Sequence, residues 1–159
     1  YPLRRQRQMC IRDRFLTGTR MSVAGCLFCD LQTSNRERIV SENKLAFAVR
    51  DGFPVAEGHT LIIPKRHTLD YFELIPDEVL AVNELIHEQR VILLESDQRI
   101  EGFNIGMNCG LVAGQSVWHC HIHLIPRRKG DSKYPKGGVR HVIPYEGDYE
   151  DLRLSLIHI

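Results

Sequence analysis

Apolar and polar residues alternate, or apolar residues run together, in four stretches of the chain, and both patterns are typical of β-strands. In residues 42–50, Leu45, Phe47 and Val49 fall on one face and predict a half-buried strand. Residues 60–64 are aliphatic and β-branched, which indicates a buried strand. We therefore expect strands over residues 42–50, 60–64, 103–108 and 117–126.

A longer segment, residues 76–96, carries apolar residues at helical spacing. Val79, Val82, Ile86 and Leu93 recur at intervals of three, four and seven positions, which places them on one face of a helix. The segment opens with Pro-Asp-Glu, a favourable helix start because proline fits the first turn and acids suit its positive end. One long helix among several short strands predicts an α+β domain, a mainly antiparallel β-sheet with the helix packed on it.

The last predicted strand contains three histidines in alternation with apolar residues. His119, His121 and His123 would share one face of this strand, with neighbouring imidazoles roughly 6 to 7 Å apart. Such a row has two chemical interpretations, a three-imidazole zinc site that activates water or a nucleophile with its helpers. The outer histidines would lie about 13 Å apart, which strains a tetrahedral metal site and favours the nucleophile.

The loop just before the histidines, residues 108–116, is rich in neutral hydrogen-bond donors. Its two glycines permit tight turns, and its amide, hydroxyl and backbone N–H groups suit phosphate oxygens. We expect Gln115 and Ser116, together with His123, to stabilise charge that grows on a phosphate, and Asn108 to hold the phosphate or ribose side.

These residues together resemble the histidine triad (HIT) family of nucleotide hydrolases and transferases. The resemblance runs from about residue 26 to about residue 126 and rests on Asp51-Gly52-Phe53-Pro54, Gly58-His59-Thr60-Leu61-Ile62-Ile63-Pro64-Lys65, Asn108, Gly114-Gln115-Ser116 and His119-x-His121-x-His123. It implies a HIT-like fold and a homodimer that joins two sheets.

The resemblance also implies roles for individual residues. His121 matches the family's nucleophile, which forms a covalent nucleotidyl intermediate that water then hydrolyses. Asp51 matches a residue that binds ribose hydroxyls, although on sequence alone it could be a turn residue only. His59 matches a histidine that orients one of the triad imidazoles through a hydrogen bond, although on sequence alone a satisfied core histidine is the favoured interpretation.

Two thiols three positions apart, Cys26 and Cys29, have the spacing with which a short turn binds zinc. In the zinc-carrying branch of the family a Cys₂His₂ site forms, and the matching residues here are Cys26, Cys29, His67 and His119. A structural zinc ion is therefore expected, with His119 bracing the nucleophile's strand. The alternative is that both cysteines are small buried apolar residues.

Three classes of function remain open. The first is a hydrolase of dinucleoside polyphosphates or related purine nucleotide conjugates, or, through the same first step, a phosphoramidase that acts on adenylated amines. The second is a zinc hydrolase in which all three histidines bind metal. The third is a nucleotide-binding module without turnover.

The two ends of the chain differ from the rest. Residues 9–14 and 154–159 can be encoded by DNA strings that are reverse complements, so we interpret residues 1–20 and 154–159 as translated tag and leader, and 21–153 as the HIT domain. Without the six arginines and one aspartate of residues 1–20, 15 basic and 19 acidic residues remain, a net charge of about −4 with neutral histidines.

That charge gives a nucleic-acid partner little support. No long apolar run predicts a membrane span, and a cytoplasmic protein without an organic cofactor is expected. The cations at residues 127–129 either face a polyphosphate tail or belong to a solvated loop.

Overall fold

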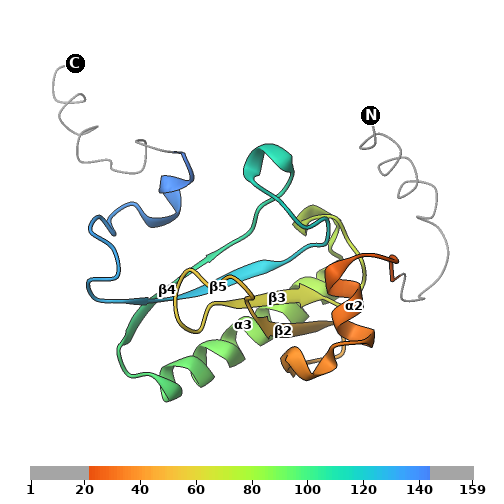
Figure 1. Ribbon diagram of the computed structural model, residues 1–159, viewed down its shortest axis with the longest axis horizontal. Coiled ribbons are helices and arrows are strands. Elements are labelled where there is room, and N and C mark those ends of the chain that lie inside the picture. The colour runs from red at the N-terminus through yellow and green to blue at the C-terminus, as the bar shows by residue number, and fades with distance from the viewer. Residues whose placement is uncertain (1–21, 144–159) are drawn as a thin grey trace.

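The computed structural model describes residues 22–143, which form one five-stranded antiparallel sheet with helices on both faces (Figure 1). The strands are β1 (Ile39–Glu42), β2 (Ala46–Arg50), β3 (Thr60–Pro64), β4 (Ile100–Gly106) and β5 (Ile122–Arg128), and their order across the sheet is β1-β2-β3-β5-β4. The predicted α+β class, with an antiparallel sheet and a helix packed on it, is confirmed. The interpreted tags, and residues 21 and 144–153 of the interpreted domain, lie outside the described residues.

The long helix α3 (Pro76–Ser96) has the predicted bounds and packs on one face of the sheet. Its start is fixed by Glu78, whose carboxylate accepts the Ile75 backbone N–H at 3.1 Å and also pairs with Arg66. Its buried stripe contains two polar residues that the apolar pattern did not include, Glu78 and Gln89. The core on this side consists of Ala46, Ala48, Ile62, Ala81, Val82, Leu85, Cys120 and Ile122.

A short helix, α2 (Leu27–Thr33), covers the opposite face and corrects the prediction for residues 42–50. That stretch is not one half-buried strand: β1 ends at Glu42, and β2 begins at Ala46 and is buried on both faces. The second face is buried because α2 lays Phe28 and Leu31 against it. This second core consists of Phe28, Leu31, Phe47, Val49, Leu61 and Ile63.

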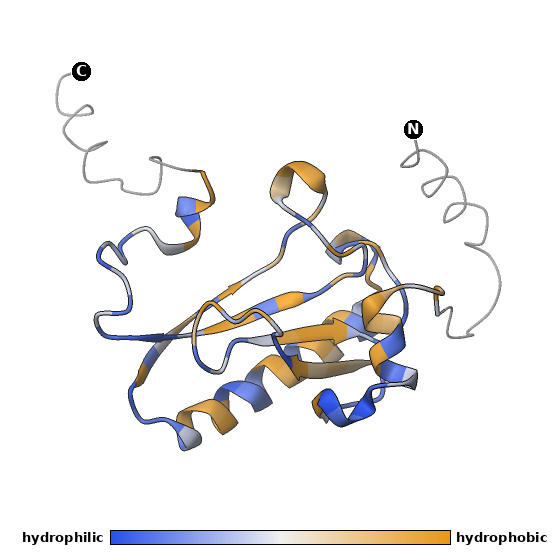
Figure 2. Ribbon diagram, in the orientation of Figure 1, coloured by the Kyte–Doolittle hydropathy of each residue, from blue (hydrophilic) through white to orange (hydrophobic). Residues whose placement is uncertain are grey.

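The strand predicted over residues 117–126 begins only at Ile122. Before it, the chain is held to a different segment, because the backbone N–H of Cys120 donates to the carbonyl oxygen of Thr68 at 2.7 Å. Within β5, Ile122 and Leu124 are buried on the α3 side, so His123 lies on the α2 side. The apolar strand residues and the inner side of α3 are visible in Figure 2.

Four short 3₁₀ segments complete the described chain: η1 (Arg36–Arg38), η2 (Tyr71–Glu73), η3 (Leu111–Ala113) and η4 (Gly138–Val142). Of these, η3 forms the tip of the loop that projects between β4 and β5 in Figure 1. Within residues 22–143, none of the helices combines the length and the apolar character that crossing a membrane requires.

Candidate functional site

The three triad histidines lie on the α2 side of the sheet, at the start of β5. The rings of His121 and His123 are 5.1 Å apart between centroids. Phe28, from α2, packs its ring edge against His121 at 5.1 Å and against His119 at 5.7 Å. This aromatic contact was not predictable from the sequence, because it depends on a seven-residue helix that apolar periodicity does not reveal.

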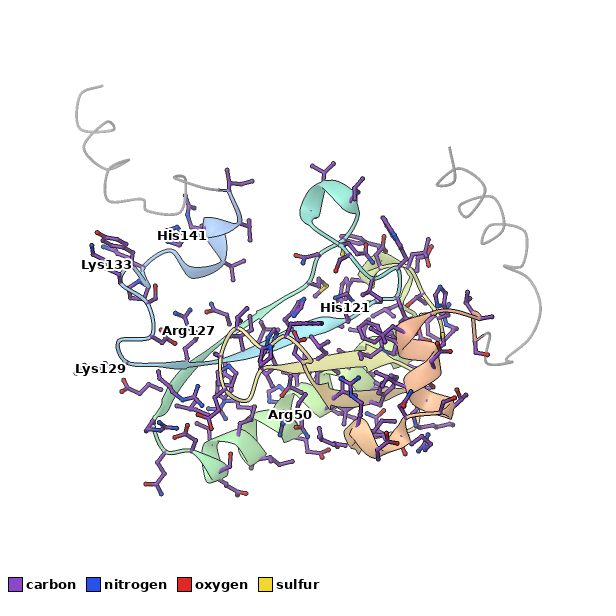
Figure 3. The ribbon with its side chains drawn as sticks, viewed as in Figure 1. Arg50, His121, Arg127, Lys129, Lys133 and His141 are labelled. Carbon is purple, nitrogen blue, oxygen red and sulfur yellow. The ribbon has the colours of Figure 1, made fainter. Side chains whose placement is uncertain are left out.

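His121 is almost fully buried, with 7% of its surface exposed (Figure 3). Its ring Nδ1 lies 2.8 Å from the backbone carbonyl oxygen of His119. A carbonyl can only accept, so Nδ1 carries the proton and Nε2 keeps a free lone pair. Burial lowers the pKa of His121, which the hydrogen bond to His119 only partly opposes. The imidazole is therefore neutral at pH 7, the form in which nitrogen is nucleophilic.

His123 is the end of a hydrogen-bonded chain that reaches Asp51. Its Nδ1 lies 3.0 Å from Nε2 of His59, and Nδ1 of His59 lies 3.2 Å from Oδ2 of Asp51. The sheet makes this contact, because Leu61 pairs with His123 and His59 lies two residues before Leu61 on the same face. Burial, with the neighbouring rings of His121 and His59, lowers the pKa of His123 to about 4.

Asp51, His59 and His123 are also close enough to be considered as metal ligands. The order in which these three side chains contact one another argues against a metal site. Asp51 contacts one nitrogen of the His59 ring and His123 contacts the other, so the three groups form a line and do not converge on one point. A line of donors and acceptors suits proton transfer.

The donor-rich loop, residues 108–116, is shaped by two glycines with left-handed backbones, Gly110 (φ 93°) and Gly114 (φ 84°), on either side of η3. Ser116 is exposed and Asn108 is partly buried. Gln115 differs from the sequence-based expectation: its side chain is 3% exposed and bonds to backbone atoms of the protein.

Cys26, Cys29, His67 and His119 come together from three segments, with all four ligand atoms within 4.8 Å of one another. The Sγ of Cys26 lies 3.4 Å from Nδ1 of His119, and the Sγ of Cys29 lies 3.4 Å from Nδ1 of His67 and 3.6 Å from that of His119. In a tetrahedral zinc site with ordinary bond lengths, sulfur and nitrogen ligands are about 3.5 Å apart. The spacing fits zinc.

The chemistry of the ligands fits zinc as well. Nε2 of His119 donates to the carbonyl oxygen of Pro64 at 2.9 Å, which leaves the Nδ1 lone pair directed at the thiols. Burial by itself would raise the pKa of Cys26, but its side-chain contacts with His119 and His67 lower it to about 5. Cys26 is then a thiolate, the form that binds metal.

The two arginines at the end of β5 are paired with acids. Arg127 pairs with Asp131 at 2.7 Å and also donates to Asn104, and Arg128 pairs with Asp97 at 2.8 Å. Figure 3 shows Arg127, Lys129 and Lys133 at the other end of β5 from His121. Beyond His123 on the same face is a hollow of about 460 Å³, lined by Val55, Ala56, Glu57, Asn104, Ile125, Arg127, Arg128 and Asp131, which the sequence did not reveal.

A buried neutral imidazole with a free nitrogen, with a second imidazole beside it and a loop of neutral donors just before it in the sequence, is the kind of site that suits small phosphate compounds. A comparison with protein families agrees, because residues 32–130 match the HIT domain. The chain belongs to the HIT family.

Relatives and solved structures extend this assignment. The chain is 39% identical over 107 residues to an uncharacterised HIT-like protein of Mycoplasma genitalium, covering 67% of this chain and 75% of that protein. It is 38% identical over 120 residues to an adenosine 5′-monophosphoramidase of Saccharomyces cerevisiae, covering 72% of this chain and 73% of that enzyme. A crystal structure of a zinc-bound histidine triad family protein from Mycobacterium smegmatis is 33% identical and superimposes with a TM-score of 0.62, covering 68% of this chain and 78% of that one.

Proposed function

We propose that this chain hydrolyses nucleotide conjugates, cleaving the bond between the α-phosphorus and its leaving group to release a nucleoside monophosphate. One observation carries the proposal: the hydrogen bond from Nδ1 of His121 to the His119 carbonyl, which fixes the tautomer and frees Nε2 for attack. The S. cerevisiae relative, named an adenosine 5′-monophosphoramidase, supports the reaction class.

The reaction has two displacements. In the first, Nε2 of His121 forms a bond to phosphorus while the bond from phosphorus to the leaving oxygen or nitrogen breaks, and the leaving atom keeps the electron pair and takes a proton from Nε2 of His123. In the second, water forms a bond to phosphorus, the phosphorus–nitrogen bond breaks, and Nε2 of His123 takes back the proton that water loses. His121 returns to its neutral form, and one difficult step is replaced by two easier ones.

His123 can move that proton, because its partner His59 has hydrogen-bond partners in two tautomers. When His59 donates from Nδ1 to Asp51, its Nε2 accepts from His123, and Nε2 of His123 faces the substrate as an acceptor. In the other tautomer the backbone N–H of Val55, 3.3 Å away, donates to Nδ1 of His59. His59 then donates to His123, which presents an N–H to the phosphate.

Charge on the phosphate oxygens needs donors that are already in position. Ser116 is exposed at the end of the donor loop, and Asn108 lies at its start. We assign both to the phosphate, with Asn108 reaching the ribose side. Asp51 keeps acceptor capacity beyond its bonds to His59 and to the Phe53 backbone N–H, so it can also hold ribose hydroxyls.

Zinc at Cys26, Cys29, His67 and His119 would supply a structural bond between α2 and the segment after β3. The chain's own residues position His121. The backbone carbonyl of His119 orients the His121 ring, and the His119 ring donates a hydrogen bond to the backbone carbonyl of Pro64.

Two substrate classes share this chemistry, dinucleoside polyphosphates and adenylated amines, and the second is favoured here. A long polyphosphate leaving group needs unpaired cations nearby. The arginines closest to His123 along β5 are instead paired, Arg127 with Asp131 and Arg128 with Asp97. Because carboxylates already neutralise these arginines, an uncharged leaving group is the better match for the site.

We further propose that the protein works as a homodimer. β4 is an edge strand of the sheet, and apolar side chains along it and in the loop that follows are exposed: Ile105, Met107, Leu111 and Val112. Figure 2 shows this apolar character at the projecting tip of η3. A second copy that pairs along β4 would cover an edge that no further strand of residues 22–143 covers. Light scattering after gel filtration measures the mass in solution.

The test of the function is mass spectrometry of a reaction quenched after mixing with an adenosine phosphoramidate or with diadenosine tetraphosphate. An adenylate on His121 that is absent from His121→Ala supports the covalent route. Release of nucleotide without any adduct, abolished by chelation, would instead favour the zinc hydrolase. Tight binding without turnover would reduce the protein to a nucleotide-binding module. The relative kcat/KM of the two substrates ranks the substrate classes.

A further inference from the structure

The side-chain amide of Gln115 is fully used within the protein. Its Nε2 donates to the carbonyl oxygens of Leu69, at 2.6 Å, and Val117, at 3.1 Å. Its Oε1 accepts the backbone N–H of Gly110 at 2.7 Å. An amide nitrogen has two hydrogens, and both are donated here. Gln115 therefore has no N–H left to offer a phosphate oxygen.

The three bonds join segments that are far apart in the sequence. Gly110 lies at the start of η3 and Val117 just after the donor loop, so Oε1 and Nε2 together span the loop's two ends. The backbone N–H of Gln115 also donates to Gly110, at 3.1 Å, which closes the loop. Leu69 belongs to another segment, 46 residues earlier.

The segment that contains Leu69 is also hydrogen-bonded to the backbone next to the proposed nucleophile, His121. Thr68, next to Leu69, accepts the N–H of Cys120, the residue between His119 and His121. His67 on the same segment belongs to the thiol–imidazole cluster. Residues 67–69 are thus a common support, bonded to the histidine row through Thr68 and to the donor loop through Leu69.

We propose that Gln115 is a positioning residue for nucleotidyl transfer, whose buried amide fixes the donor loop, and with it the Ser116 hydroxyl, relative to His121. The proposal rests on the proposed function, and it replaces the direct contact with substrate that the sequence suggested. Outer groups that orient reacting groups by hydrogen bonds commonly change activity by about 10- to 100-fold when they are lost.

The experiment uses the full chain and the variant Gln115→Met, which has similar length and fills the same space without hydrogen bonds. Gln115→Glu is the second variant: it keeps an acceptor for Gly110 but places a carboxylate oxygen against the Leu69 and Val117 carbonyls. Gln89→Met is the matched control, because Gln89 is also a buried glutamine that bonds to Arg50, on α3 away from the donor loop.

Two measurements are made on folded protein. The first is amide hydrogen exchange of Gly110, whose N–H is bonded to Gln115. The second is a double-mutant cycle of kcat with Ser116→Ala. We expect Gly110 exchange to rise most in Gln115→Met, which has no acceptor, less in Gln115→Glu, and not in Gln89→Met, and kcat to be about 10- to 100-fold lower in Gln115→Met. In the Ser116→Ala background, Gln115→Met should cost less than about threefold more, because the group that it positions is gone.

Unchanged Gly110 exchange in Gln115→Met, or full additivity with Ser116→Ala, would overturn the proposal in favour of a direct or purely structural role. The exchange measurement does not depend on turnover. If the proposed function is wrong, even the wild type will not hydrolyse these substrates. If only the positioning role of Gln115 is wrong, the wild type will be active and Gln115→Met will leave the exchange of Gly110 unchanged.

Discussion

The backbone carbonyl oxygen of His119 accepts a hydrogen bond from Nδ1 of His121 at 2.8 Å, while the His119 ring is directed at two thiols. One residue thus connects the cysteine cluster to the proposed nucleophile. Because the ring of His119 is fixed on both sides, by Pro64 and by the thiols, its carbonyl has a defined direction. That direction determines which nitrogen of His121 is free.

This relationship predicts the pH dependence of hydrolysis. The proposed nucleophile, His121, would react in its neutral form, and burial lowers its pKa below the usual 6.5, so activity should fall only when the pH drops below that value. We expect kcat/KM to be level through neutral pH, with its acid limb below pH 6.5. A pH–rate profile measures this, and an acid limb at or above pH 6.5 would contradict the assignment.

Acid should also destabilise the fold. His59, His121 and His123 all have pKa values below the usual value, that of His123 at about 4, so between about pH 6.5 and 4 the unfolded chain binds more protons than the folded one. The free energy of unfolding must then fall as the pH decreases through this window.

Urea unfolding at a series of pH values tests the sign of this dependence. His123→Asn should flatten the dependence, whereas His87→Gln should leave it unchanged, because His87 is exposed on α3. Stability that rises on acidification would exclude the lowered pKa values.

Removal of metal from the cluster of Cys26, Cys29, His67 and His119 is expected to lower the free energy of unfolding before it affects activity. A ligand that binds only the folded chain stabilises it by about 4 kcal/mol at a thousandfold excess over its Kd. A chelator, or Cys29→Ser, should lower the melting temperature and the zinc content measured by mass spectrometry. Cys109→Ser is the control, because Cys109 is a partly buried free cysteine outside the cluster. Equal zinc content in both variants would remove Cys29 from the site.

Most of the fold was predictable because its signals are local. The spacing of apolar residues marked α3 with its observed bounds, and the aliphatic run of residues 60–64 marked β3. β1 was missed because its sequence, Ile-Val-Ser-Glu, shows no alternation of apolar and polar residues, although its burial alternates between partly buried and exposed positions. The burial of β2 on both faces was missed because α2, the helix that covers it, is only seven residues long and coincides with the cysteine pair.

The sequence indicates which residues lie at the candidate site better than it indicates which partners those residues contact. His119, His121 and His123 share a face because alternation in an extended chain is a local property. The partner of His123 depends on the pairing of β3 with β5. The direction of the Gln115 amide depends on Leu69, 46 residues away. No property of residues 108–116 alone indicates whether that amide points to a ligand or into the protein.

Asp51 gives a prediction that separates two roles. If Asp51 acts on His123 through His59, its loss should lower kcat, whereas the loss of a contact to ribose alone would raise KM. We expect Asp51→Asn to lower kcat by on the order of 10- to 100-fold. Glu57→Gln, in the same loop but exposed, should have little effect. A rise in KM at unchanged kcat would leave only the ribose contact.

Gly58 should be essential for the position of this loop, for two physical reasons. Its backbone is left-handed, with φ at 84°, and a Cβ there would lie 2.8 Å from Cδ2 of Leu93 and 3.3 Å from Cγ of Pro126, both buried residues. Gly58→Ala should therefore cost about 1–3 kcal/mol of unfolding free energy. Because His59 is the next residue, the displaced backbone should also lower kcat.

The matched control is Gly102→Ala in β4, where an added Cβ meets no atom within 4 Å and no left-handed backbone is required. Chemical denaturation and steady-state kinetics of the two alanine variants decide the matter. Gly58→Ala could lower stability without lowering kcat. That result would mean that the loop can move while Asp51, His59 and His123 stay hydrogen-bonded. Only β3 and β5 would then hold these three residues in place.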